Sequence, residues 1–312
     1  MTGKKPVPFT FSRLIASVRR KDPPITAVVH PCDPESVRGA VEATRRKLIR
    51  AVLVGPQAKI RRAAEEAAVS IRGLEIVATE HSEAAAVAAV AMAREGRADC
   101  LMKGSLHTDE LMSAVVAESG GLRTARRVSH AFVLDVPAYP RPLIITDAAI
   151  NIYPDLEEKR DIVQNAIDLA HALGIVRPRV AILSAVETVT PKIRSTLDAA
   201  ALCKMADRGQ ITGGILDGPL AFDIAISEAA RRTKHVHSAV AGRPDILLVP
   251  DLEAGNMLAK QLQYLAGAKS AGIVLGARVP IALTSRSDLA ESRLASCAIA
   301  SLMRVHGLRK KA

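Results

Sequence analysis

The sequence is poor in aromatic side chains and has no long apolar segment. Among 312 residues there are three Tyr, four Phe and no Trp. Single-stranded nucleic acids are held largely by aromatic rings that stack on the bases, so the sequence argues against a nucleic-acid partner. The longest apolar run covers residues 84–93, which is far too short to cross a bilayer, and we expect no membrane span.

Cysteine is also scarce, and its spacing excludes two common frameworks. The chain has four cysteines and no CxxC pair, so neither a zinc site nor a set of disulfides is indicated. His235 and His237 have no cluster of Cys or carboxylates beside them, and we interpret them as surface histidines. Free thiols are typical of a reducing compartment, and the N-terminus lacks a secretory pattern. We therefore expect a cytoplasmic protein without a metal centre.

Basic residues exceed acidic ones, which gives a formal net charge of +11. Such a charge is typical of proteins that bind nucleic acid, anionic membranes or small polyanions such as phosphate and nucleotides. The Lys and Arg residues are scattered in short groups along the chain rather than gathered in one block. Most of these groups indicate solvated helix faces, so the charge alone does not select a partner.

Short β-branched runs alternate with Ala-rich amphipathic stretches along the chain, and 49% of the residues are apolar. A chain of this length suits two α/β domains, and the alternation favours parallel sheets covered by helices on both faces. The spacing predicts strands at 25–30, 51–54, 74–78, 100–103, 131–134, 143–146, 180–183, 214–216, 246–249, 272–275 and 281–283. Helices are predicted at 35–47, 82–95, 156–173, 191–208 and 287–303, with a short leader helix at 11–19. Asp33-Pro34 and Thr190-Pro191 are start signals for two of them.

Polar turns follow several of the predicted strands, where ligands bind in open parallel sheets. These turns read Lys103-Gly104-Ser105, Asp217-Gly218-Pro219, Glu253-Ala254-Gly255-Asn256 and Thr284-Ser285-Arg286-Ser287-Asp288. Several would begin helices whose free N–H groups can hold an anion. From spacing alone each has a structural alternative, because the same residues form helix caps and tight turns.

Three of these turns belong to longer blocks that resemble one known family. Residues 240–256 read VAGRPDILLVPDLEAGN, residues 217–223 read DGPLAFD, and residues 280–288 read PIALTSRSD. The run RVAILS at 179–184 adds to the series. Taken together and in this order, the blocks resemble those of the phosphate acetyltransferase/phosphate butyryltransferase family, the phosphotransacylases. The resemblance extends from about residue 98 to the end.

The resemblance implies a fold and a domain division. Family members have two α/β/α domains with a cleft between them, like isocitrate and isopropylmalate dehydrogenases, and their final segment returns to the first domain. We therefore predict a first domain at 1–136 plus 273–312, carrying the Ser-Arg pair, and a second at 137–272, because the Pro-rich stretch 137–142 breaks regular structure. Members are commonly homodimers and use no metal.

The resemblance also implies the reaction, in which acyl-CoA and phosphate give acyl phosphate and CoA. CoA is then a substrate, and no cofactor is expected. Ser285 and Arg286 match the pair that holds the acyl carbonyl and phosphate. The base stays open between Asp288 and Glu291, since the chain reads Ala290-Glu291-Ser292 where the acetyltransferase branch has its acidic residue. Residues expected to bind CoA or phosphate are Lys103, Gly104, Arg123, Asp217, Gly218, Gly255 and Asn256.

The acyl group and two other functions stay open. The chain lacks an Arg that the acetyl branch has after its His-Thr region, and Lys103 or Arg123 could replace it. Several turns look closer to the butyryl branch, so both acetyl and short-chain acyl groups are expected. The alternatives are a metal- and NAD(P)-dependent hydroxyacid dehydrogenase of the same fold and a non-catalytic basic binding protein. The absence of GxGxxG argues against the first alternative, and the lack of aromatics against the second.

Overall fold

The structure is a computed structural model that describes residues 8–18, 21–284 and 289–311. It divides the chain into two compact units. The first, here called the β1 unit, comprises Phe11–Val128 and Ala271–Ala312, and the second, the β6 unit, comprises Met1–Thr10 and Ser129–Ser270. Ser285, Arg286, Ser287 and Asp288 lie outside the described residues.

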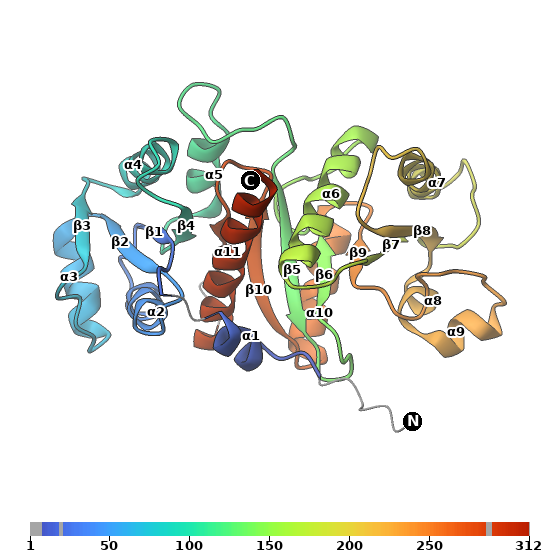
Figure 1. Cartoon of the computed structure of the whole chain (residues 1–312), viewed down its shortest axis with the longest axis horizontal. Helices are drawn as coiled ribbons and strands as arrows, with labels where there is room; N and C mark the ends of the chain where they lie inside the picture. The colour runs from blue at the N-terminus through green and yellow to red at the C-terminus, as the bar shows by residue number, and fades with distance from the viewer. Residues whose placement is uncertain (1–7, 19–20, 285–288, 312) are drawn as a thin grey trace. The chain divides into compact units, whose positions relative to one another are not determined.

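The β1 unit is built on six strands in the order β3-β2-β1-β4-β11-β10. All are parallel except β10, which pairs with β11 in the antiparallel direction. Helices α1, α2 and α11 lie on one face of this sheet and α4 and α5 on the other (Figure 1). Its strands are β1 (Ile25–Val29), β2 (Arg50–Gly55), β3 (Glu75–Ala78), β4 (Cys100–Lys103), β10 (Lys269–Leu275) and β11 (Ile281–Ala282). Its helices are α1 (Phe11–Ser17), α2 (Pro34–Arg45), α3 (Gln57–Glu66), α4 (Ser82–Arg94), α5 (Thr108–Val116) and α11 (Ala290–Lys311).

The β6 unit has five strands in the order β5-β6-β9-β7-β8. Strand β5 is antiparallel to β6, and the other pairs are parallel. Helices α6 and α7 cover one face, and α8, α9 and α10 belong to the other (Figure 1). Its strands are β5 (Ser129–Asp135), β6 (Leu143–Thr146), β7 (Arg179–Leu183), β8 (Ile215–Leu220) and β9 (Ile246–Leu248). Its helices are α6 (Leu156–Ala172), α7 (Arg194–Asp207), α8 (Phe222–Ile226), α9 (Glu228–Thr233) and α10 (Leu252–Leu265).

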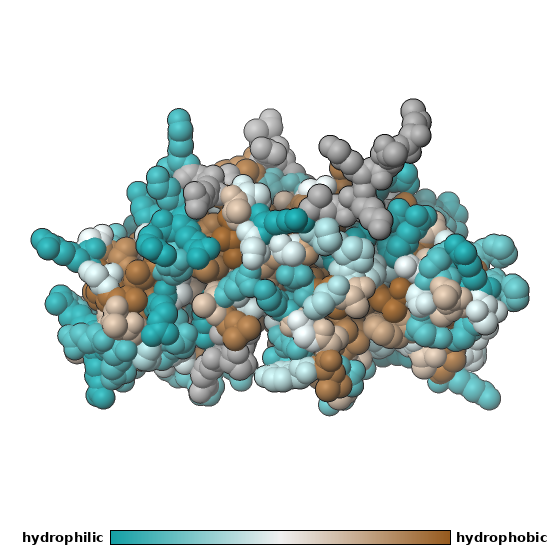
Figure 2. All heavy atoms as spheres, turned by 90° about the horizontal axis from the view of Figure 1, so that it is seen from below, coloured by the Kyte–Doolittle hydropathy of each residue, from teal (hydrophilic) through white to brown (hydrophobic). Residues whose placement is uncertain are grey.

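The core of each unit consists of aliphatic side chains, as a sequence without Trp requires. In the β6 unit, Leu247 and Ala181 from the sheet are fully buried together with Ile224 from α8. The face in Figure 2 is largely hydrophilic, with separate hydrophobic patches. No helix among the described residues combines the length and the apolar character that crossing a membrane would need.

The helix start signals had different outcomes. Asp33 caps α2 as predicted, since its carboxylate accepts the N–H groups of Glu35 and Ser36, both at 3.0 Å. The predicted start at Thr190-Pro191 is wrong, because α7 begins at Arg194. The Thr196 hydroxyl donates to the Thr190 carbonyl (2.8 Å), which holds the preceding residues in a turn rather than in the helix.

The sheets are mixed rather than purely parallel, and this explains the position of the Pro-rich stretch. Residues 137–142 form the connection between the antiparallel strands β5 and β6, so they lie inside one unit and not between two. The division instead falls after Val128 and within β10, after Ser270. Residues 8–10 belong to the β6 unit, where the Phe9 N–H donates to the Pro140 carbonyl (3.1 Å).

Candidate functional site

Lys103 ends strand β4 at the carboxyl edge of the β1 unit's sheet. Its side chain is buried, with 4% of the residue exposed. The ammonium group lies 3.4 Å from the Gly104 carbonyl and 3.5 Å from the carbonyl of Thr284, which follows the neighbouring strand β11. The Thr284 hydroxyl donates to the Lys103 carbonyl at 2.9 Å. The structure therefore holds a cation against the segment that leads directly into the Ser-Arg pair.

Gly104 lies where β4 comes closest to β1. A Cβ atom at this position would be 2.4 Å from the Val29 carbonyl oxygen and 2.6 Å from that of His30. The Gly104 N–H donates to the same Val29 carbonyl (2.9 Å). Close backbone approach thus explains why glycine stands here, while its predicted contact with substrate stays a prediction.

His30 was missed by the sequence reasoning, although it lies beside this turn. It follows β1 with a backbone φ of 52°, and its Nδ1 is 3.1 Å from the Ser105 hydroxyl oxygen. Burial is the main cause that lowers its pKa, and the positive charge of Lys59 adds to this effect. Nothing in the local sequence reveals the contact, because the two partners are 75 residues apart.

Most of the residues to which the resemblance assigns the reaction lie in a segment that the structure does not describe. Ser285, Arg286 and Asp288 lie outside the described residues, between Thr284 and the start of α11. Glu291, in the first turn of α11, accepts a hydrogen bond from the Ser12 hydroxyl at 2.6 Å. This contact directs one carboxylate oxygen toward α1.

Arg123 is exposed and lies at the opposite edge of the same sheet from Lys103. Its neighbours are bound to the turn between β10 and β11: the Arg278 N–H donates to the Leu122 carbonyl (2.9 Å), and the Thr124 hydroxyl donates to the Gly276 carbonyl (2.6 Å). That turn lies where β11 begins, whereas Lys103 lies beside its end. Within the β1 unit, therefore, the structure does not bring Arg123 to Lys103.

Gly255 and Asn256 lie in the first turns of α10 and pack against the end of β6. A Cβ atom on Gly255 would be 2.6 Å from the Asp147 carbonyl oxygen. The Asn256 side-chain amide donates to the Ala148 carbonyl at 3.2 Å. These two residues are therefore brought together with the Thr146-Asp147 turn at the end of β6.

Asp147 is a buried carboxylate that accepts three hydrogen bonds from its own turn and one from strand β5. It accepts the N–H groups of Ala149 (2.9 Å), Ile150 (3.0 Å) and His130 (3.0 Å), and the Asn151 amide at 2.6 Å. Burial raises its pKa, and these donors act in the opposite direction. With four donors on two oxygens, the carboxylate fixes the turn and has little capacity left for a ligand.

His130 lies on strand β5 beside this turn and is fully buried. Among the described residues neither ring nitrogen has a hydrogen-bond partner, and the ring packs edge-on against Phe132 with 4.5 Å between the ring centroids. Burial lowers the pKa of His130 to about 3, so the ring is neutral at pH 7. A buried imidazole without partners is costly for stability.

Asp217 and Gly218 lie within strand β8 and not in a turn after it, which corrects the predicted strand end at residue 216. The register between β7 and β8 shifts after Asp217, so the strand continues through an irregularity. Pro219 is tolerated there because β8 is an edge strand. A Cβ atom on Gly218 would be 2.7 Å from the Ile182 carbonyl oxygen, so glycine is needed for close packing.

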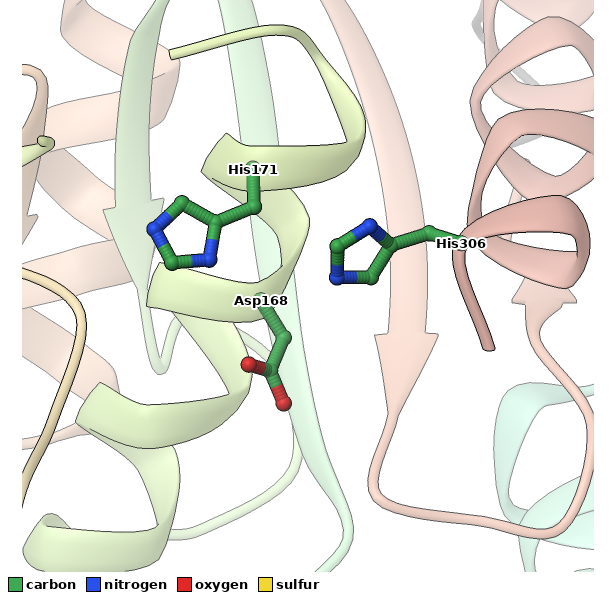
Figure 3. A group of neighbouring side chains, drawn as sticks. All are labelled: Asp168, His171 and His306. Carbon is green, nitrogen blue, oxygen red and sulfur yellow. The ribbon is translucent and has the colours of Figure 1, made fainter. Parts of the chain in front are cut away.

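Figure 3 shows the side chains of Asp168, His171 and His306, which are of the types that bind metal ions in proteins. Asp168 and His171 lie one turn apart on α6 of the β6 unit, whereas His306 lies on α11 of the β1 unit. His171 Nε2 is 2.9 Å from the Gly213 carbonyl oxygen. Two side chains from α6 are fewer than the three or four protein ligands of a zinc site, so α6 by itself provides no metal centre.

Comparisons with known proteins agree on one family. The model of the family described as "Phosphate acetyl/butaryl transferase" matches residues 78–301. A phosphate acetyltransferase of Rhizobium meliloti is 63% identical over 295 residues, covering 95% of this chain and 93% of that protein. A phosphate butyryltransferase of Clostridium acetobutylicum is 41% identical and covers 94% of this chain and 98% of its own length.

A solved structure supports the same assignment. The crystal structure of a branched-chain phosphotransacylase from Enterococcus faecalis V583 superposes with a TM-score of 0.78 and 29% identity, covering 90% of this chain and 98% of that one. The family match spans both units and includes the turns that carry Lys103 and Gly255. The chain therefore belongs to the phosphate acetyl/butyryl transferase family, which makes it an acyltransferase.

Proposed function

We propose that the chain transfers an acetyl group between coenzyme A and inorganic phosphate, giving acetyl phosphate. The observation that carries the choice of acyl group is sequence identity: the relative named for acetyl transfer shares 63% of its aligned residues with this chain, and the relative named for butyryl transfer shares 41%. Butyryl transfer is therefore the weaker candidate. In this reaction the CoA thioester is a substrate, and no cofactor is required.

The buried Lys103 supports a site for anions at the carboxyl edge of the β1 unit. Both substrates carry phosphate groups, and a desolvated ammonium interacts more strongly with an anion than a solvated one does. Lys103 contacts the Thr284 carbonyl, and the next two residues are Ser285 and Arg286. We assign phosphate binding to Arg286, because a guanidinium can bind phosphate through two parallel hydrogen bonds. Ser285 would donate to the acyl carbonyl oxygen.

The barrier would be lowered by placement and by charge stabilisation. A phosphate oxygen attacks the acyl carbon and forms a tetrahedral oxyanion, which donors from Ser285 and Arg286 stabilise as the charge develops. Holding both substrates side by side supplies the proximity that the free reaction lacks. In the reverse direction a base must remove the CoA thiol proton, and Asp288 and Glu291 are the carboxylates nearest in sequence to this pair.

The remaining predicted contacts are proposals of different strength. Gly255 and Asn256 shape the start of α10, where a close turn would receive part of CoA. Asp217 and Gly218 lie on an irregular edge strand and would contact the nucleotide portion of CoA from the backbone. Arg123, on the opposite edge of the β1 unit, would at most bind substrate from a second copy of the chain. The cleft and the dehydrogenase-like arrangement of domains remain part of this proposal.

A cytoplasmic location is proposed from the cysteines. All four are free thiols, and burial is the main cause that raises the pKa of each one. Thiols with raised pKa react slowly with oxidants because the thiolate is the reactive form. Such residues suit a reducing compartment.

A homodimer is proposed from the exposed face of α10. Met257, Tyr264 and Leu265 lie on one side of this helix and are 58%, 73% and 85% exposed. Ile152 (61%) and Tyr153 (73%) extend the patch, since the Leu252 N–H at the start of α10 donates to the Ile152 carbonyl. These five side chains are uncharged in a chain of net charge +11, so a second copy can bind there without the repulsion that the rest of its surface would cause.

The assay that tests the function measures free thiol released from acetyl-, propionyl- and butyryl-CoA with and without phosphate. We expect release to require phosphate and kcat/KM to be highest with acetyl-CoA. Reduction of NAD(P)+ with hydroxyacids and divalent metal provides the control for the dehydrogenase alternative. Thiol release that is independent of phosphate, or no release at all, would refute the proposal.

A further inference from the structure

His30 is held in a backbone conformation that few non-glycine residues adopt. Its φ of 52° lies in the left-handed region, where Asn, Asp and His are several-fold enriched over other side chains. The residue directly follows β1 at the carboxyl edge of the sheet, where ligands bind in such folds. Residues held in this conformation collect at functional sites.

The hydrogen bonds of Ser105 fix which ring nitrogen of His30 carries the proton. The Ser105 hydroxyl has a single proton, and it points to the His30 carbonyl oxygen at 2.7 Å. The same hydroxyl oxygen accepts the Cys32 N–H at 3.2 Å. Because its proton is already used, the hydroxyl must also accept at the 3.1 Å contact, so His30 Nδ1 is the donor. In the neutral ring, Nε2 therefore keeps its lone pair, and no described residue is a hydrogen-bond partner of Nε2.

The charges around His30 favour the neutral ring at pH 7. Burial and the ammonium of Lys59 lower its pKa, whereas Glu110 and Asp33 act to raise it and are outweighed. Glu110 comes from α5, and one of its carboxylate oxygens is buried without a hydrogen-bond partner in the described part of the chain. Cys32 also lies beside the ring's partner Ser105, and its raised pKa keeps it uncharged.

The imidazole shares its edge of the sheet with the proposed phosphate site. Strand β4 lies between β1 and β11, so the Lys103–Ser105 turn is bound on one side by His30 and on the other by Thr284. Two strand spacings, about 10 Å, separate β1 from β11. The imidazole of His30 therefore lies at the end of the strand next to β4, which carries the buried Lys103 of the proposed phosphate site.

We propose that His30 is the general base that accepts the CoA thiol proton through Nε2, which rests on the proposed acyl transfer. As the proton moves to Nε2, the sulfur forms its bond to the acyl carbon of the acyl phosphate. The bond from that carbon to the bridging oxygen breaks, and phosphate leaves with the electron pair and takes up the proton from the imidazolium. In the opposite direction the imidazolium protonates the departing thiolate. Glu291 is already engaged by Ser12, which leaves His30 the better-placed acceptor among the described residues.

The decisive variant is His30→Asn, because Asn keeps the structural features and loses only the base. An Asn side-chain amide can donate to Ser105 as Nδ1 does, and Asn tolerates the left-handed backbone. The matched control is His235→Asn, since His235 is exposed and has a φ of 54°. We expect His30→Asn to lower kcat/KM with acetyl phosphate and CoA by about 100-fold or more and to remove the acidic limb of its pH profile. Its melting temperature and that of the control should stay close to the parent value.

A second variant covers the case in which His30→Asn perturbs the fold. His30→Gly suits the positive φ and leaves a space for a small base, so added imidazole should restore activity in proportion to its free-base concentration. A purely structural histidine would give no such rescue. The inference is overturned if His30→Asn keeps its rate and its acidic limb, or if imidazole fails to restore folded His30→Gly. If the proposed function itself is wrong, the parent protein will show no phosphate-dependent thiol release, which distinguishes that outcome from a failure of the His30 inference alone.

Discussion

The carboxyl edges of the two sheets differ in how their polar groups are used. At the edge of the β6 unit, Asp147 is bound by three donors from its own turn and one from strand β5, and Gly255 packs directly on that turn. At the edge of the β1 unit, Lys103 is buried beside carbonyl groups and His30 keeps a nitrogen lone pair for a ligand. From this comparison we propose that the β1 unit supplies the reacting groups, while the polar residues of the β6 unit stabilise the backbone of that unit.

The largest effect is expected at the edge of the β1 unit, from Arg286→Ala. Loss of a donor to developing negative charge costs about 2–4 kcal/mol of transition-state stabilisation, so kcat/KM should fall by about 30-fold to 1,000-fold with the fold intact. Arg286→Lys should recover only part of the loss, because an ammonium lacks the planar fork. Steady-state kinetics and circular dichroism provide the test. Near-normal kinetics in the alanine variant would make Arg286 a structural residue and would weaken the proposed difference in role between the β1 and β6 units.

Variants of Asp288 and Glu291, the carboxylates that follow Ser285 and Arg286 in the sequence, test which residue is the base. Asp288→Asn and Glu291→Gln should each keep the acidic limb of the pH profile in the thiol-consuming direction if His30 is the base. Glu291→Gln should lose less activity than Asp288→Asn, since a Gln side chain still accepts a hydrogen bond from the Ser12 hydroxyl. Loss of the limb in either variant, together with most of the rate, would transfer the role of base to that carboxylate.

At the edge of the β6 unit, Gly255→Ala should affect stability before chemistry. The added methyl group meets the Asp147 carbonyl oxygen at 2.6 Å, and backbone has to move, which costs about 1–3 kcal/mol. Gly307→Ala is the matched control, because a Cβ there has nothing within 4 Å and Ala is the better helix residue. Thermal unfolding should show a lower melting temperature for Gly255→Ala and an equal or higher one for Gly307→Ala. Equal melting temperatures would show that the turn is not tightly packed.

The exposed α10 patch of the β6 unit can be tested by Leu265→Lys. A charge placed within an apolar contact between copies should shift the chain from dimer to monomer in sedimentation experiments. Val176→Lys is the control, because Val176 is also apolar and 84% exposed but lies outside the patch. A parent protein that sediments as a monomer, or equal dimerisation of both variants, would exclude α10 as the interface.

The smallest effect is expected from His130→Phe, which replaces a buried ring lacking hydrogen bonds by an apolar ring. The folded-state pKa of His130, about 3, lies below the usual value of 6.5, so the folded state binds fewer protons and loses stability as the pH falls through this range. His130→Phe removes that dependence. Its advantage in unfolding free energy over the parent should therefore grow from pH 7 to pH 5. An advantage that is the same at both values would show that His130 does not titrate on unfolding.

Local signals in the sequence predicted much of the fold. The Asp33-Pro34 signal placed α2, since a cap and a first-turn proline act within a few residues. The Thr190-Pro191 signal failed because the Thr196 hydroxyl competes for the same backbone groups. Residues 137–142 were read as a domain boundary, yet only strand pairing shows that they connect an antiparallel pair.

The candidate site was less accessible from sequence than the fold. Lys103 and the 280–288 block could be found because they follow strands and match family blocks. His30 could not be found, because its role depends on a left-handed φ and on Ser105, which is distant in sequence. Lys103 and Arg123 were both predicted from the resemblance as replacements for an Arg of the acetyl branch, and the hydrogen bonds of Arg123's neighbours place it at the edge opposite to Lys103.

The most direct test of acyl transfer is to follow the oxygen atoms of phosphate. With acetyl-CoA and phosphate carrying 18O at all four positions, attack by phosphate on the acyl carbon keeps every labelled oxygen bonded to phosphorus. We predict that 31P nuclear magnetic resonance shows acetyl phosphate in which all four oxygens on phosphorus are 18O. Acetyl phosphate that has lost one label, or thiol release without any acetyl phosphate, would contradict the account.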